Sequence, residues 1–302
     1  AAPDAEWRVR LALLSPPRES PGAPPQVRGF LHASAASAAI AARLPTLAAC
    51  GANVLIVGET GTGKEVCAQA VHYLSARAAR PMVAVNCGAI PAELVEAELF
   101  GHVKGAYTTA HASRSGLVQE AEGGTLFLDD VDCLPLQAQA KLLRFLQEHE
   151  YRPLGSNAVR RADVRVVAAS NCDLYALSRQ DRFRQDLYFR LNVLNIALPP
   201  LRDRREDLPV LALHFARGFA REFDRPARTL SSAALAKLAQ HDWPGNVREL
   251  QHVIERAVVL AAGPVLGVAD IDIDLATPSR DDAPQASFRD AKKRVVDAFE
   301  RD

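Results

Sequence analysis

The stretch NVLIVGETGTGKEVCAQAVHYL, residues 53–74, contains the pattern that decides the fold. It begins with a short apolar run, NVLIVG, that is typical of a buried strand, and it ends with apolar side chains at helical spacing. Between them, GETGTGKE has the spacing G-x-x-x-x-G-K. Glycines let backbone amides face phosphate oxygens, while a helix amino terminus and Lys64 add positive charge. This strand, loop and helix therefore predict a nucleotide-binding P-loop.

The P-loop prediction assigns one role to eight consecutive residues. The nucleotide-binding residues that we expect are Gly58, Glu59, Thr60, Gly61, Thr62, Gly63, Lys64 and Glu65. Lys64 would neutralise the β and γ phosphates, so the expected cofactors are ATP and Mg²⁺. Glu65 stands where most P-loops place the Ser or Thr that binds Mg²⁺.

A second motif, GGTLFLDDVD at residues 123–132, follows later in the chain. An apolar strand that ends in two carboxylates suits a Walker B motif, in which Asp129 would hold Mg²⁺ and Asp130 would polarise the attacking water. Asp130 is one methylene shorter than the Glu that is usual at this position. Because a misplacement of order 1 Å can cost on the order of a hundredfold in rate, we expect slow hydrolysis unless the backbone compensates.

Three arginines lie in contexts that suit phosphate chemistry. FRQDLYFRLNVLNI carries Arg184 and Arg190 just before an apolar run. There they could act as arginine fingers on a neighbouring subunit's γ-phosphate, which requires a ring. WPGNVREL places Arg248 in the first turn of a helix, where a positive charge opposes the helix dipole unless an anion such as phosphate offsets it. A solvated surface position is the alternative for each.

Apolar runs and helical patterns alternate from residue 27 to residue 198. The runs lie at residues 53–58, 82–87, 125–131, 164–170 and 193–198. Near-continuous apolar strands separated by amphipathic helices predict an α/β fold with a parallel five-stranded sheet flanked by helices. Residues 199–275 have no strand pattern and predict a small all-helical lid subdomain. In it, Ser231 and Ser232 are candidate helix caps, and Asn246 and Glu249 have the spacing of a capping box.

Both ends of the chain have linker composition. Residues 1–26 include the Pro-rich SPPRESPGAPPQ, and we expect a linker or the remnant of a preceding domain. Residues 276–302 include the polar TPSRDDAPQAS at 277–287 and continue with a helical pattern that has one apolar face. This pattern indicates the start of a truncated C-terminal domain.

Composition indicates a globular protein with no net charge, and therefore no overall electrostatic attraction to nucleic acid or membranes. The 302 residues include 36 basic and 36 acidic side chains, so any DNA contact is expected to be local. The five cysteines form no C-x-x-C pair and are interpreted as buried free thiols in a reducing cytoplasm. No apolar run approaches the ~20 residues needed to span a bilayer. We expect a cytoplasmic protein with no membrane partner.

Together, the motifs resemble the central AAA+ domain of the bacterial enhancer-binding proteins, the NtrC family of sigma-54-dependent transcription activators. The resemblance covers roughly residues 27–275 and follows signatures in unbroken order. They read GETGTGKE, NCGAIPAELVEAELFGH, GAYTTA, GGTLFLDDVD, LLRFLQEHEYRPLG, FRQDLYFRLNV, LPPLRDRREDLP and WPGNVRELQHVIERAV. Glu65, which is unusual for P-loops in general, is normal in this family.

The resemblance implies an oligomeric ATPase, usually a homohexameric ring, with nucleotide bound between subunits. By position, Asn86 matches the Asn that communicates with the Walker B carboxylate, and Asn171 matches the sensor I polar residue. Arg184 and Arg190 match the arginines that act on the neighbouring subunit. Arg248 matches the sensor II arginine.

The resemblance also implies a role for the loop GAYTTA. Its residues are Gly105, Ala106, Tyr107, Thr108, Thr109 and Ala110. The family motif reads GAFTGA and caps a loop that rises on ATP binding and contacts sigma-54. Tyr107 keeps the aromatic ring and adds a hydroxyl. Thr109 replaces a glycine and would resist a positive φ angle, at a cost of roughly 1 to 3 kcal/mol.

Two functions remain open at this point. In the first, ATP hydrolysis drives the loop against RNA polymerase containing sigma-54 and opens promoters, while a C-terminal helix-turn-helix of the Fis type binds DNA. In the second, the core mainly senses nucleotide and sets the oligomeric state of a DNA-binding regulator that acts without sigma-54. A cyclic dinucleotide near the P-loop is a further candidate ligand, to which Arg28 could contribute a phosphate contact.

Overall fold

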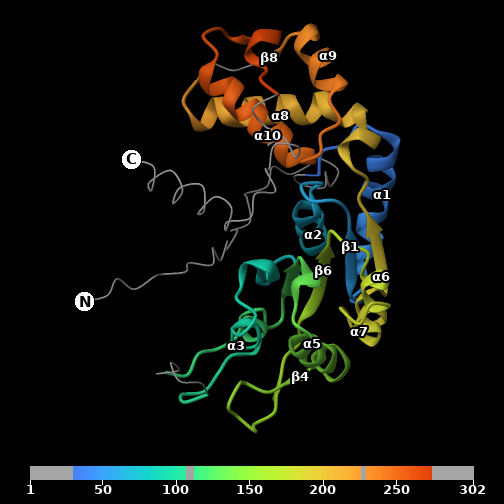
Figure 1. Ribbon diagram of the computed structural model, residues 1–302, viewed down its shortest axis with the longest axis vertical. Helices are drawn as coiled ribbons and strands as arrows, with labels where there is room; N and C mark the ends of the chain where they lie inside the picture. Colours follow the sequence, from blue (N-terminus) through green and yellow to red (C-terminus); the bar gives the residue numbers. More distant parts are fainter. Residues whose placement is uncertain (1–29, 107–111, 226–228, 274–302) are drawn as a thin grey trace, which may run out of the picture.

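The computed structural model describes residues 30–106, 112–225 and 229–273. An α/β part and a helical part lie one above the other and are joined by a connector at residues 199–207 (Figure 1). Several predictions fall outside the described residues. They concern residues 1–26 and 276–302, Arg28, and the loop residues Tyr107, Thr108, Thr109 and Ala110. Within the described ranges, no helix is long and apolar enough to cross a membrane.

The α/β part contains one parallel sheet. Its strands are β1 (Val54–Val57), β2 (Met82–Asn86), β3 (Thr125–Asp129), β6 (Arg165–Ser170) and β7 (Leu194–Ala197). Neighbouring strands are parallel in the order β2-β3-β6-β1-β7, which confirms the predicted five-stranded sheet. Since parallel strands end at the same edge, the loops after β1, β3 and β6 lie side by side there.

Helices cover both faces of the sheet (Figure 1). α1 (Ala35–Ala49) and α2 (Lys64–Tyr73) pack on one face. The other face carries α3 (Val95–Phe100), α4 (Leu117–Glu120), α5 (Leu136–Glu148), α6 (Leu174–Ser178) and α7 (Gln185–Leu191). Successive side chains of a strand point to opposite faces of the sheet, so there is a hydrophobic core on each face. Val54 and Ile56 of β1 belong to the core under α1 and α2, and Leu55 belongs to the core on the other face.

Short elements complete the α/β part. The 3₁₀ turns η1 (Cys87–Ala89) and η2 (Val131–Cys133) follow β2 and β3. β4 (Glu150–Tyr151) pairs antiparallel with β5 (Arg160–Arg161) and forms a small hairpin outside the main sheet.

The helical part forms the predicted lid. It contains α8 (Leu208–Glu222), α9 (Ser232–Gln240), α10 (Asn246–Leu260) and η5 (Val268–Asp270). The 3₁₀ turns η3 (Leu201–Asp203) and η4 (Arg205–Asp207) lie in the connector that leads to it. The core of the lid includes the fully buried Trp243. One feature was not predicted, since β8 (Thr229–Leu230) and β9 (Val265–Leu266) form a parallel pair. Strands of two residues are too short to produce a recognisable alternation.

The predicted helix caps have different outcomes. Ser231 caps α9 as expected, since its hydroxyl accepts the Ala234 N–H at 3.1 Å. The capping box predicted for Asn246 and Glu249 is wrong. The Glu249 carboxylate accepts the Gly245 N–H at 2.8 Å, whereas Asn246 has a left-handed φ of 55° and its side chain reaches the P-loop instead.

The expectation of buried thiols is correct for only part of the set. All five cysteines are free, and Cys67 and Cys87 are buried. Cys50, Cys133 and Cys172 are exposed, because they lie where α1, η2 and β6 end and the chain turns.

A buried arginine ties α1 to the sheet. Arg165, at the start of β6, is 3% exposed and donates to the carbonyls of Leu47, Ala48 and Ala52 at 2.7, 2.9 and 3.2 Å. Leu47 and Ala48 belong to the last turn of α1, where a cation also interacts favourably with the helix dipole. The guanidinium thereby satisfies carbonyls that have no partner within the helix.

Replacing Arg165 with Met should lower the free energy of unfolding by about 3 kcal/mol or more, because three carbonyls lose a charged donor. Urea denaturation followed by circular dichroism would measure the change. Arg161→Met, at an exposed position of β5, is the matched control and should unfold at nearly the wild-type urea concentration. Equal midpoints for the two variants would contradict the structural role of Arg165.

Candidate functional site

The P-loop connects β1 to α2 and requires glycine at several positions. Gly61 and Gly63 have left-handed φ angles of 79° and 98°. A Cβ atom on Gly61 would lie 2.3 Å from the Gly245 carbonyl oxygen, and a Cβ atom on Gly58 would lie 2.8 Å from that of Leu198. The glycines therefore allow both the backbone conformation and the close approach of the lid.

Lys64 is the first residue of α2 and is 7% exposed. Its Nζ donates to the carbonyls of Gly58 and Glu59 at 2.9 and 3.3 Å. Burial lowers the pKa of Lys64, while the nearby carboxylates of Asp129 and Asp130 act to raise it. The ammonium group thus lies within the P-loop and is influenced by the two carboxylates at the end of β3, as the binding of a magnesium triphosphate requires.

The two acidic residues at the end of β3, Asp129 and Asp130, are partly buried and have different environments. Burial and the charge of Asp130 raise the pKa of Asp129, against the lowering effect of Lys64. Asp130 has a left-handed backbone, with φ 50° and ψ 49°, and its Oδ2 accepts Asn86 Nδ2 at 3.1 Å. Asn86 ends the neighbouring strand β2, so the side chains paired by the resemblance are in contact. Such a backbone costs about 1 kcal/mol or more and is most frequent at functional sites.

Asn171 directly follows β6, the strand between β3 and β1. Its Nδ2 lies 3.4 Å from the Thr60 hydroxyl oxygen, next to the P-loop. Two residues near Asn171, Ser170 and Asp132, were not predicted from the sequence. The Ser170 hydroxyl donates to Asp132 Oδ1 at 2.7 Å. The third acid of GGTLFLDDVD was the available signal for this contact, which fixes the turn that presents Asn171.

Helix α7 lies toward the end of the α/β part that is away from the lid (Figure 1). Arg184 directly precedes this helix, and Arg190 is in its last turn. Arg184 pairs with Asp186 at 2.8 Å, and Arg190 donates from Nε and Nη2 to the Leu146 carbonyl at 3.0 and 2.8 Å. The Arg190 carbonyl accepts Asn53 Nδ2 at 3.1 Å, and Asn53 precedes β1 whereas the P-loop follows it. The length of β1, about 13 Å, therefore separates them. Within the described residues, no polar contact joins either arginine to the pocket.

Arg248 lies in the first turn of α10, on the lid, and is exposed. This turn touches the P-loop, since the Val247 N–H donates to the Gly61 carbonyl at 2.9 Å. Burial lowers the pKa of Lys64 most, and the charge of Arg248 lowers it further. A Cβ atom on Gly61 would lie 3.2 Å from the Arg248 Cβ, so the Arg248 side chain begins beside the P-loop.

The donor set suits a magnesium nucleotide. In the part of the chain that the structure describes, no group of three or more His, Cys, Asp or Glu side chains could hold a metal ion. Mg²⁺ needs only one or two protein carboxylates when phosphates supply further ligands. Asp129, near Lys64, provides such a carboxylate.

The loop at residues 105–110 is described only at its first two residues. Gly105 has a left-handed φ of 82°. Ala106 lies against the segment between β4 and β5, because a Cβ atom on Gly155 would come within 2.8 Å of the Ala106 Cβ. The Val103 N–H donates to the Leu154 carbonyl at 3.0 Å. The base of the loop therefore rests on the β4–β5 hairpin.

The sheet order, the P-loop, the acidic pair and the helical lid define a P-loop ATPase of the AAA+ class. A family model for the Sigma-54 interaction domain matches residues 30–197, and a model for the AAA+ ATPase lid domain matches residues 202–288. The chain therefore belongs to the Sigma-54 interaction domain family and carries an AAA+ lid.

Curated relatives and solved structures agree with this assignment. The chain is 49% identical over 227 residues to the regulatory protein AtoC of Escherichia coli, with 75% of this chain and 49% of AtoC covered. It is 46% identical over 274 residues to the alginate biosynthesis transcriptional regulatory protein AlgB of Pseudomonas aeruginosa, with 89% and 61% covered. NtrX from Brucella abortus in complex with ADP has a TM-score of 0.75 at 30% identity, with 88% of this chain and 61% of that chain covered. The chain spans less than two thirds of the length of each.

Replacing Gly61 with Ala should weaken nucleotide binding by at least about tenfold, because the methyl group meets the Gly245 carbonyl and the left-handed backbone is strained. Titration of a fluorescent ADP analogue would measure the dissociation constant. Gly51→Ala is the control, since a Cβ atom there meets nothing within 4 Å. A Gly61→Ala variant with wild-type affinity would disagree with this geometry.

Proposed function

We propose that this chain is the ATP-hydrolysing core of a transcription regulator that assembles into a ring and remodels RNA polymerase containing sigma-54. The observation that carries the proposal is the match of a Sigma-54 interaction domain to the residues that build the pocket. The names of the relatives support the regulatory part, since AlgB is a transcriptional regulatory protein and AtoC a regulatory protein.

ATP would bind between the P-loop and the first turn of α10. Loop amides and Lys64 would contact the phosphates, and Arg248 would approach them from the lid. Asp129 would hold Mg²⁺, which stabilises the charge of the phosphates when it is bound. NtrX, which shares the fold, is known in complex with ATP and with ADP, and this supports a nucleotide in the pocket.

Asp130 would polarise the attacking water, with Asn171 placed to contact the γ-phosphate. The contact with Asn86 occupies Oδ2 of Asp130 and leaves Oδ1 for the water. The left-handed backbone at Asp130 turns the chain directly after β3. We propose that this turn compensates for the methylene that Asp lacks relative to Glu, so that the short side chain serves the same step.

Arg184 and Arg190 would act on the pocket of a neighbouring copy. The backbone of Arg190 lies at the start of β1, whereas the P-loop of the same chain follows the end of β1. Arg184 donates to Asp186, and Arg190 donates to the Leu146 carbonyl. Phosphates of a neighbouring copy would replace these acceptors. A ring, usually of six subunits, gives every pocket such a neighbour.

The loop at residues 105–110 would contact sigma-54, with Tyr107 as its aromatic residue. The hairpin under Ala106 would support the base of the loop against the load of remodelling. DNA would be bound through a C-terminal helix-turn-helix. The alternative, a core that only senses nucleotide, rests on the loop sequence GAYTTA and on Asp130, and the family match favours remodelling.

Mixing two inactive variants tests the shared pocket. Asp130→Asn should bind ATP without hydrolysing it, and the double variant Arg184→Ala with Arg190→Ala should lose on the order of a thousandfold in turnover. In an equimolar mixture, about a quarter of the interfaces pair an intact pocket with intact arginines. Up to about a quarter of wild-type phosphate release should therefore return.

The exposed Arg221 provides the control for this mixture, because Arg221→Ala alone should keep wild-type turnover. Turnover per chain should also rise with protein concentration if neighbouring copies complete the pocket. A mixture no more active than its parts, together with a concentration-independent rate, would rule out the shared site.

Promoter opening distinguishes remodelling from nucleotide sensing. With polymerase containing sigma-54 and ATP, the wild-type protein should open promoter DNA, as detected by permanganate reactivity. Tyr107→Ala should lose at least about tenfold in opening while its ATPase rate stays unchanged, because the loop loses its aromatic contact. Asp130→Ala should lose both activities. Steady ATP turnover without any opening would favour the nucleotide-sensing function.

A further inference from the structure

Consecutive carbonyls of the P-loop are hydrogen-bonded by groups from outside the loop. The Thr60 carbonyl accepts Asn246 Nδ2 at 3.0 Å, the Gly61 carbonyl accepts the Val247 N–H at 2.9 Å, and the Thr62 carbonyl accepts Arg204 Nη2 at 2.6 Å. Two of the donors begin α10 of the lid, and the third lies in the connector.

Because the peptide group is planar, the three hydrogen bonds to the P-loop carbonyls also fix the direction of the N–H groups that follow them. In a trans peptide, the carbonyl and the N–H that follows it point in opposite directions. Carbonyls held from the lid side therefore direct the N–H groups of residues 61–63 to the other side. The Thr62 N–H donates to the Glu59 carbonyl at 3.3 Å, whereas the N–H groups of Gly61 and Gly63 donate to no acceptor in the described part of the chain. The amides of Gly61 and Gly63 are therefore available to an anion.

We propose that Arg204 and Asn246 are positioning residues that set the phosphate-binding shape of the P-loop, and that they couple the position of the lid to nucleotide affinity. The inference rests on the proposed nucleotide site. It adds residues that act on the phosphates only through the loop backbone.

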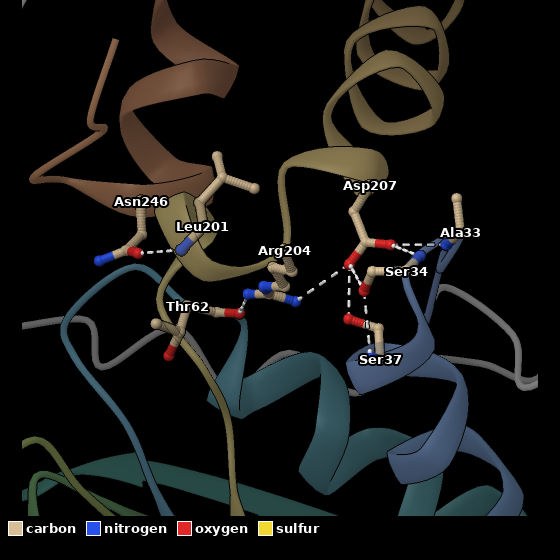
Figure 2. Close-up of polar contacts among 8 residues, drawn as sticks. All are labelled: Ala33, Ser34, Ser37, Thr62, Leu201, Arg204, Asp207 and Asn246. Carbon is tan, nitrogen blue, oxygen red and sulfur yellow. Dashed lines mark hydrogen bonds and ion pairs between the residues drawn. The ribbon is translucent and has the colours of Figure 1, made fainter. Parts of the chain in front are cut away.

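Arg204 is held in place by buried partners (Figure 2). It is 3% exposed, and its Nη1 lies 4.0 Å from Asp207 Oδ2. Its Nε has no hydrogen-bond partner among the described residues. Burying a guanidinium with an unsatisfied nitrogen costs free energy, so packing alone does not explain this side chain. Its bond to the Thr62 carbonyl provides the explanation.

Asp207 anchors Arg204 to the start of α1 (Figure 2). The fully buried carboxylate accepts the N–H groups of Ala33 and Ser34 at 2.5 and 2.6 Å. It also accepts the hydroxyls of Ser34 and Ser37 at 3.1 and 2.5 Å. Burial acts to raise the pKa of Asp207, but these hydrogen bonds lower it below its ordinary value. The carboxylate is therefore ionised at neutral pH and holds the guanidinium electrostatically.

Asn246 joins the loop, the connector and the lid through one amide. Its Oδ1 accepts the Leu201 N–H at 2.8 Å, and its Nδ2 donates to the Thr60 carbonyl and, at 3.1 Å, to Glu59 Oε2. Glu59 also forms a two-bond ion pair with Arg202 of the connector, at 2.9 and 2.5 Å. Asn tolerates the left-handed backbone found here better than most residues do.

These contacts make the lid and the loop one mechanical unit. A rotation of the lid must either carry the P-loop carbonyls with it or break the bonds to Asn246, Val247 and Arg204. Phosphate bound to the loop amides would favour the bonded arrangement. By linkage, a bonded lid would favour phosphate to the same extent.

Substitution of Arg204 tests the proposal. Arg204→Met removes the donor and should raise the dissociation constants for ADP and ATP by at least about tenfold, whereas Arg204→Lys keeps a charged donor and should recover most of the affinity. Arg205→Met is the matched control, because this neighbouring side chain donates to the Ala239 carbonyl and to Asp242. It should bind nucleotide like the wild type. A fluorescent ADP analogue would measure affinity, and thermal denaturation would check folding.

Asn246→Asp is the second variant and serves if Arg204→Met does not fold. It keeps the acceptor for Leu201 but places a carboxylate oxygen against Glu59 and the Thr60 carbonyl. Affinity should fall at least about tenfold, and KM for ATP should rise more than kcat falls. Either variant, folded and with wild-type affinity, would overturn the proposal. A wild-type protein that binds no nucleotide would overturn the proposed function instead.

Discussion

The arrangement of this molecule depends on a fully buried carboxylate, that of Asp207. A buried charge is costly to desolvate. Here hydrogen bonds from Ala33 and Ser34 just before α1, and from Ser37 within it, compensate for that cost together with the nearby guanidinium of Arg204. The start of α1, the connector and the P-loop are thereby held at one point, although they are far apart in sequence (Figure 2). The lid contacts the P-loop directly, because the Val247 N–H of α10 donates to the Gly61 carbonyl at 2.9 Å. The position of the lid therefore depends on the loop that it covers.

The parallel sheet determines where the remaining chemistry lies. Because β1, β3 and β6 are neighbours, the P-loop, the acidic pair and Asn171 meet at one edge. The helix α7 leads into the amino end of β7, so Arg190 starts from the opposite edge. If Arg184 and Arg190 act on a nucleotide as proposed, they act on the pocket of another copy. The proposed ring is therefore a consequence of strand direction.

Much of the fold and pocket could be predicted because the signals are local. GETGTGKE is contiguous, and each strand of the sheet is a near-continuous apolar run, so period and spacing identify them. Long-range contacts gave no such signal. Asn246 had the spacing of a cap, but a tertiary contact with Thr60 takes its side chain. Arg204 and Arg165 appear in the sequence as ordinary charges, and only the folded chain shows that each is buried against carbonyls. The roles of the pocket residues remain predictions.

The groups that hold the P-loop carbonyls come late in the chain. Arg204 lies 142 residues after Thr62, and Asn246 lies 186 residues after Thr60. Synthesis proceeds from the amino terminus, so the loop leaves the ribosome long before either partner has been translated. If those partners shape the loop as proposed, a nascent chain that still lacks them has low affinity for cellular ATP. Nucleotide binding then begins only when α10 has emerged from the ribosome and packed against the P-loop.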